Sequence, residues 1–96
     1  TGIATIAVTI NGKGKVEATH LVRSSGIAVF DREALRTARA VSYPVTGKSG
    51  TIAMVLGFNK PVTDEMQKEG RRLVVAWRDE QRIMLANNIA AQQPDS

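Results

Sequence analysis

The sequence predicts an α+β fold: a small antiparallel β-sheet of three strands, packed with one short helix and one long C-terminal helix. Three observations carry this prediction. Two stretches within the first 23 residues alternate apolar and polar side chains with period two, and a third such stretch lies at 51–58. A segment between them has helical character and ends at a Tyr-Pro pair. After Val62 the apolar period lengthens towards 3.6, so the expected order is β-β-α-β followed by a helix.

The first two strands are expected at 3–10 and 15–23, joined as a hairpin. Both contain β-branched residues, which favour a strand with one buried face. Asn11-Gly12-Lys13-Gly14 lies between them. Asn-Gly is the strongest short turn signal because both residues tolerate positive φ, and a second glycine suits a bulge. The face of the second strand that is expected to be buried carries Val16, Ala18, His20 and Val22.

The short helix is expected at 32–41, after Ser24-Ser25-Gly26 breaks the second strand. Asp31 is a good N-cap residue, and two arginines towards the C-terminal end match the helix dipole. Pro44 ends the helix because it has no N–H to donate and pushes Tyr43 out of helical geometry. The apolar positions of this helix share one face, which is expected to lie against the sheet.

The third strand is expected at 51–58, and its two faces differ in size. One face carries Ile52, Met54, Leu56 and Phe58. The other carries only small residues, Ala53, Val55 and Gly57. Another element can therefore pack closely over this second face.

The long amphipathic helix is expected at 63–90, with Thr63 or Asp64 as its cap. Gly70 is a candidate interruption, and Leu73–Trp77 is an alternative short fourth strand. Gln92–Ser96 is expected to be a frayed tail. The apolar stripe of the helix is longer than three short strands can cover, so a second copy of the chain is one way to cover the rest. That stripe consists of Met66, Leu73, Trp77 and Met84.

Composition places limits on the function. The chain has 96 residues, enough for one compact core, and its net charge is +4 with the basic residues scattered along the sequence. A solvated, slightly basic surface is favoured over a nucleic-acid footprint. The absence of cysteine excludes disulfides and thiolate chemistry. Because residue 1 is Thr, we expect the sequence to be a piece of a longer protein, and no apolar run approaches the roughly 20 residues of a membrane span.

No group of residues predicts catalysis or metal binding. Gly47-Lys48-Ser49 resembles the end of a phosphate loop, but the required upstream glycine is absent and a strand follows. Ser24 and Ser25 lack the glycine of a nucleophile elbow, and His20, the only histidine, is expected to be structural. The acidic pairs at 64–65 and 79–80 lie in basic segments, as on solvated helix faces. We therefore expect no catalytic residue, no metal and no cofactor.

The pieces of residues 2–58, taken in order, resemble the C-terminal domain of TonB-family energy transducers. In that family, a glycine-containing turn with a basic residue and Val is followed by a second strand that runs into Ser-Ser-Gly. A helix then begins at an Asp followed by Ala-Leu, and Tyr-Pro and a strand that ends in an aromatic residue come next. The corresponding residues here are Asn11-Gly12-Lys13-Gly14-Lys15-Val16, Ser24-Ser25-Gly26, Asp31, Ala34-Leu35, Arg36, Arg39, Tyr43-Pro44 and Phe58.

The resemblance implies a periplasmic binding module, with no enzyme activity, that couples inner-membrane energy to nutrient uptake. Such proteins are anchored in the inner membrane by an N-terminal helix, where they meet motor proteins, and they grip outer-membrane receptors for siderophores, haem or other scarce nutrients. By resemblance, the grip is β-strand addition to the last strand of the sheet. The residues implied here are Thr51, Ile52, Ala53, Met54, Val55, Leu56, Gly57 and Phe58.

The resemblance leaves residues 61–96 without a counterpart, so we expect a TonB-like domain at 1–60 and a helical extension at 61–96. Three roles stay open for the extension: to cover the sheet edge, to replace an upstream helix that the family has, or to form a homodimer. Two other functions also stay open. One is a TolA-like or secretion-linked envelope scaffold, and the other is a small basic RNA-binding domain, although the chain lacks the exposed aromatics that stack bases on such sheets.

Overall fold

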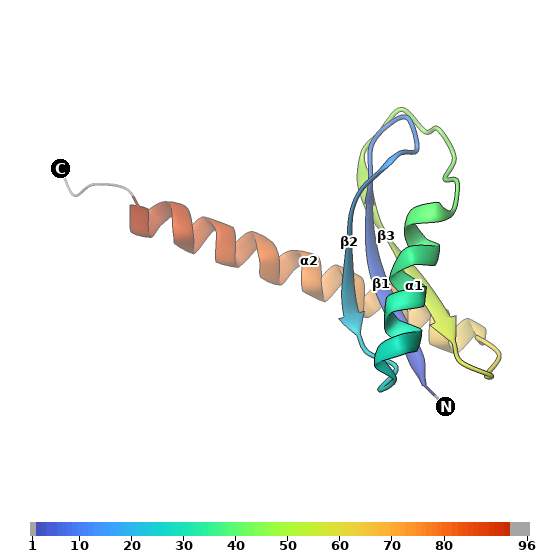
Figure 1. Cartoon of the computed structure of the whole chain (residues 1–96). Helices are drawn as coiled ribbons and strands as arrows, with labels where there is room; N and C mark the ends of the chain where they lie inside the picture. Colours follow the sequence, from blue (N-terminus) through green and yellow to red (C-terminus); the bar gives the residue numbers. More distant parts are fainter. Residues whose placement is uncertain (1, 93–96) are drawn as a thin grey trace.

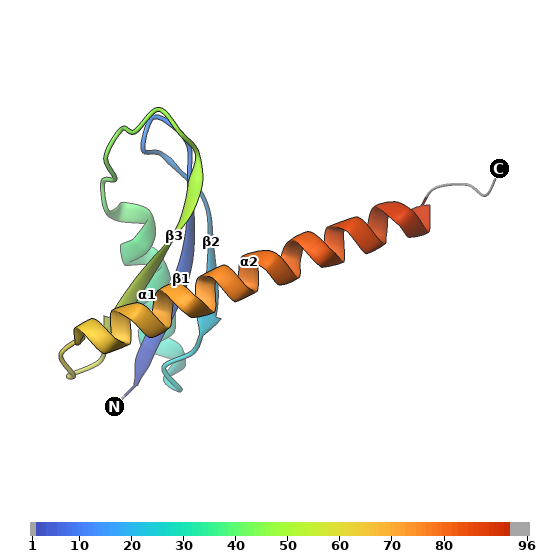
Figure 2. The same cartoon turned by 180° about the vertical axis from the view of Figure 1, so that it is seen from behind.

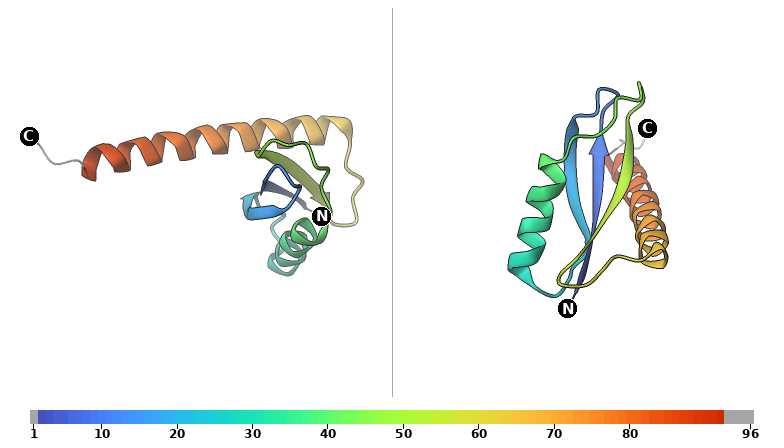
Figure 3. Two further views of the ribbon diagram at one scale, coloured as in Figure 1. Left: turned by 90° about the horizontal axis from the view of Figure 1, so that it is seen from above. Right: turned by 90° about the vertical axis from the view of Figure 1, so that its right-hand side faces the viewer.

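A computed structural model describes residues 2–92 of the chain, with side chains described to residue 88, and it confirms the predicted α+β fold. Figure 1 shows a three-stranded antiparallel sheet of order β2-β1-β3, with a short helix and a long one. The sheet is the middle layer, because α1 covers one face and α2 crosses the other (Figure 3). The elements are β1 (Ile3–Ile10), β2 (Val16–Arg23), α1 (Ala28–Ala40), β3 (Gly50–Gly57) and α2 (Asp64–Gln92).

The β1–β2 hairpin forms as predicted, with Asn11 at its turn. The Asn11 side-chain oxygen accepts hydrogen bonds from the backbone N–H groups of Lys13 (2.9 Å) and Lys15 (3.0 Å). Gly14 has φ of 80°, and a Cβ there would collide with the Tyr43 carbonyl. Glycine is therefore required at this position.

Two irregularities in the β1–β2 register change which β2 residues share a face. The pairing shifts between Thr9 and Ile10, so Val16 packs against the α1 core while His20 faces α2. The prediction that His20 lies on a buried face is wrong. Its side chain is exposed, and its ring centre lies 4.9 Å from that of Trp77. A bulge adds a residue and reverses the inside–outside alternation, which periodicity alone does not reveal.

The main apolar core lies between the sheet and α1. Ile6 and Val8 of β1 are fully buried, and Ala34 and Ala38 are the small α1 residues that let the helix approach them. The helix begins at Ala28 rather than at residue 32, so the prediction of Asp31 as N-cap is wrong. The N-cap is Ile27, which has no side chain that can cap the helix. Asp31 lies in the first turn, where its buried carboxylate points towards the preceding loop.

The long helix α2 is continuous over 29 residues, with no break at Gly70 and no fourth strand at Leu73–Trp77. Thr63 caps it as predicted, because its hydroxyl accepts the N–H of Met66 at 3.2 Å. A Cβ at Gly70 would collide with the Val55 side chain, so glycine here brings the helix backbone close to the sheet. The small residues of β3 allow this close approach.

Beyond Trp77, α2 leaves the sheet and extends past the β2 edge (Figure 2). The chain consequently measures 57 × 31 × 24 Å. On the projecting part, Ile83, Met84 and Leu85 are 62%, 55% and 61% exposed. Although α2 is long, no helix among residues 2–92 is apolar enough to cross a membrane.

Candidate functional site

The outer edge of β3 is the feature closest to the expected binding site. In the described part of the chain, β3 pairs only with β1, which leaves its other side without a strand. The Phe58 N–H donates to the Gly2 carbonyl at 3.0 Å, at the end of this antiparallel ladder. Because hydrogen-bonded and non-bonded positions alternate, the backbone groups that point outward belong to Thr51, Ala53, Val55 and Gly57.

The predicted segment Thr51–Phe58 does not lie uniformly along this edge. Phe58, the last residue of the segment, lies just after the end of the strand. Its ring contacts the Phe30 ring edge to face, with the two ring centres 5.2 Å apart. The Lys60 carbonyl lies where a Gly57 side chain would be, so the loop after β3 crowds that end. The accessible edge is therefore the part of β3 from Gly50 to Val55.

The faces of β3 are already occupied by the two helices. Met54 and Leu56 pack against the core on the α1 side. Val55 is buried under α2 on the other side. The helix α2 thus covers a face of the sheet and does not pair with the edge.

A small pocket lies in the corner between β3 and α2, beside the edge. It measures about 280 Å³ and is lined by Thr51, Ile52, Ala53, Arg71, Val74 and Val75. No β1 residue lines it, which places the pocket at the outer side of the sheet. The α2 residues of this pocket were not predicted to be functional. The available signal was the helical period that puts Arg71 and Val75 on one side of α2, next to the small face of β3.

Comparison with protein families gives a match over residues 1–59 to the family described as Gram-negative bacterial TonB protein C-terminal. The chain belongs to this family. No curated protein and no solved structure gives a significant match. Membership implies a periplasmic domain of a non-catalytic kind that interacts with outer-membrane receptors. The matched region includes the whole sheet and α1, and it ends before α2 begins.

The Ser-Ser-Gly segment of this TonB C-terminal domain is held by a buried carboxylate. The Ser24 hydroxyl donates to Asp31, and Ser25 donates through its N–H (2.9 Å) and its hydroxyl (2.7 Å). Burial by itself raises the pKa of Asp31, but these hydrogen bonds outweigh it and bring the pKa below its ordinary value of 3.8. The hydrogen bonds of Ser24 and Ser25 to Asp31 thus connect the segment after β2 to the first turn of α1.

Tyr43 closes the other end of α1. Its hydroxyl donates to the Ala38 carbonyl at 2.8 Å, and burial raises the pKa of this hydroxyl. Pro44 follows immediately and is exposed. The Tyr43 hydroxyl therefore ties the segment that follows α1 to the last turn of the helix, which ends at Ala40.

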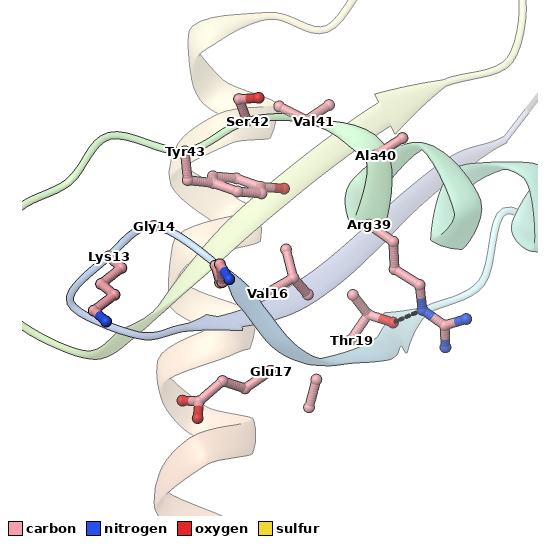
Figure 4. Close-up of a pocket in the computed structure, with 12 residues that line it drawn as sticks. Lys13, Gly14, Val16, Glu17, Thr19, Arg39, Ala40, Val41, Ser42 and Tyr43 are labelled. Carbon is pink, nitrogen blue, oxygen red and sulfur yellow. Dashed lines mark hydrogen bonds between the residues drawn. The ribbon is translucent and has the colours of Figure 1, made fainter.

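A second, larger pocket of about 630 Å³ lies between β2 and the C-terminal end of α1 (Figure 4). Arg39 donates to the Thr19 hydroxyl at 3.2 Å across it, and Lys13 lies at its hairpin end. Its lining includes no histidine, and Glu17 is its one carboxylate. Across the described residues, no cluster of three potential metal ligands occurs.

Proposed function

We propose that this chain is the periplasmic binding module of a TonB-like energy transducer, which grips an outer-membrane receptor by β-strand addition to β3. The observation that supports the proposal is the outer edge of β3, which pairs with no strand among residues 2–92, in a domain of this family. Main-chain donors and acceptors at a sheet edge can bind an extended segment with little demand on its side chains. The module itself performs no chemical step.

The proposed role includes the rest of the transducer. An inner-membrane anchor and motor proteins, acting through a segment outside this sequence, would supply the pull, and siderophore or haem receptors would receive it. Force applied along paired strands loads several backbone hydrogen bonds together. A strand edge is therefore a suitable contact for transmitting tension while tolerating different receptor sequences.

Ala53→Pro tests the edge. The Ala53 N–H points outward, so proline removes a donor available to a partner and leaves the β1 bonds in place. The probes are synthetic peptides covering the N-terminal segments of outer-membrane receptors from the same cell. Isothermal titration should show binding a few-fold to about tenfold weaker for the variant, as the loss of one backbone hydrogen bond predicts.

The matched control is Ala53→Ser, which keeps the N–H and a small side chain and should bind as wild type. Circular dichroism establishes that both variants are folded. A second variant, Val55→Pro, removes the next outward donor and should also weaken binding, although Val55 packs under α2 as well. Equal peptide affinity for Ala53→Pro and Ala53→Ser would contradict strand addition at this edge.

A homodimer through the projecting end of α2 is also proposed. Its support is the exposure of Ile83, Met84 and Leu85. Sedimentation of the wild type should show a concentration-dependent dimer that Met84→Glu abolishes. A wild-type chain that stays monomeric at millimolar concentration would contradict the dimer.

A further inference from the structure

We propose that the pocket between β3 and α2 selects the partner segment, by accepting one apolar side chain with a carboxylate two residues away on the same face. This inference rests on the proposed function, because the pocket has a use only if an extended segment pairs with β3. It adds a side-chain preference to a contact that backbone groups alone would leave unselective.

The pocket lies where a side chain of a strand added to the β3 edge would point. A strand added outside β3 would lie about 4.8 Å away, and every second side chain would point to the α2 face. The pocket opens on that face, at the level of Thr51 and Ala53. A side chain placed opposite Ala53 on this face would therefore enter it.

The apolar part of the pocket determines the first preference. Val74 is buried at 3% exposure and forms its inner wall, whereas Val75 remains 46% exposed at its mouth. Ala53 leaves space because its side chain is a single methyl group. An aliphatic or aromatic side chain of the partner would cover Val75 and remove apolar surface from water.

The charge at the pocket determines the second preference. Arg71 lines the rim, and among residues 2–88 its guanidinium has no carboxylate within 4.0 Å. The nearby Glu69 carboxylate is already paired with Arg72 at 2.9 Å. Same-face residues of a strand are about 7 Å apart, which is within reach of a long arginine side chain. A partner carboxylate there would form a charge-assisted hydrogen bond.

The residues that give this preference belong to the part of the chain beyond the family match. Arg71, Val74 and Val75 lie on α2, whereas the match ends at residue 59. The sheet edge is thus the shared element, and α2 adds a second wall beside it. Selection at this wall would be a property of this chain.

A displayed library of random eight-residue peptides tests the inference even while the natural partner is unidentified. The library is panned on the wild type, on Ala53→Pro and on Arg71→Glu. Arg36→Glu serves as the matched control because it makes the same charge change on α1, where Arg36 is exposed. Wild type and control should enrich one alternating pattern, an apolar residue with Asp or Glu two positions along.

The variants separate the inference from the proposed function. Ala53→Pro should lose the enriched peptides altogether. Arg71→Glu should still bind strands but reverse the charge preference, and it should weaken the acidic peptides about tenfold or more. If Arg71→Glu enriches the same acidic pattern as the wild type, the pocket inference is overturned while strand addition stands. If the wild type enriches no peptide that depends on Ala53, both are overturned.

Discussion

The two faces of the sheet are closed in different ways. On the α1 face, large side chains such as Ile6 and Val8 fill the space and are fully buried. On the α2 face, the middle of β1 carries the smaller residues Thr5 and Ala7, and the helix backbone itself approaches the sheet at Gly70. The first face has a continuous apolar core, whereas the second leaves an open corner beside β3.

This difference suggests a division of roles, in which the α1 face provides stability and the open corner beside β3 is available for binding. The apolar side chains buried on the α1 face are expected to contribute most of the hydrophobic free energy of folding. This free energy follows the apolar area removed from water. The α2 face has less apolar area to bury, so α2 can project past the sheet and leave part of its stripe exposed. A rigid core beneath one face is what allows an edge strand to stay in register while its other side is open.

The largest expected effect is on the α1 face. Ile6→Ala should lower the free energy of unfolding by about 2–5 kcal/mol, because it creates a cavity in the core. The matched control is Ile52→Ala, since Ile52 is 38% exposed and should lose only about 1 kcal/mol. Urea unfolding followed by circular dichroism measures both. Both residues lie on the α1 face, so equal losses would mean that the cost of truncation does not follow the burial of the side chain.

A smaller effect tests the close approach of α2. Gly70→Ala should destabilise the chain by about 1–3 kcal/mol, because the new Cβ collides with Val55. On an isolated helix the same change would instead stabilise by about 1 kcal/mol. In the double variant Gly70→Ala/Val55→Ala, the alanine at 70 should no longer be unfavourable relative to Val55→Ala alone. A stabilising Gly70→Ala in the wild-type background would show that α2 is not seated on β3.

The smallest effect concerns the hydrogen bonds of Asp31 to Ser24 and Ser25, which connect the segment after β2 to α1. Asp31→Asn should cost about 1 kcal/mol at neutral pH, since neutral hydrogen bonds replace charge-assisted ones. Because the pKa of Asp31 is lowered in the folded chain, its contribution is present above the unfolded pKa of about 4 and is lost as pH falls below it. Thermal unfolding between pH 2 and 7 should therefore show a smaller acid-side loss for Asp31→Asn than for the wild type. Parallel pH profiles would contradict a stabilising carboxylate.

Several elements were predictable because their signals are local. The Asn-Gly turn specified the hairpin, and β1 falls at the predicted residues. The strand β3 is displaced by one residue from its expected position, and α2 begins one residue after the expected start, with Thr63 as its cap. The TonB resemblance rested on short motifs in sequence order, and the family match over residues 1–59 confirms it.

Other features depended on contacts between distant residues. The helix α1 starts at Ala28, earlier than predicted, and Asp31 lies within its first turn, where it bonds to Ser24 and Ser25 instead of capping the helix. His20 faces Trp77 because a bulge in the hairpin shifts the alternation. The corner pocket combines residues some 20 positions apart in sequence, from β3 and α2, which no local pattern relates.

By itself, the sequence determined the order of the elements, the hairpin, the end of α1 shortly before Tyr43-Pro44 and the family, because turn residues, periodicity and proline act through local geometry. Only the tertiary structure decided that α2 crosses the face opposite α1, that the β3 edge has no strand beside it among the described residues, and that Arg71 and Val75 border that edge. These facts depend on which apolar surfaces pack against each other in the folded chain. The area that each residue buries is set by residues far away in the sequence, so no short segment specifies it.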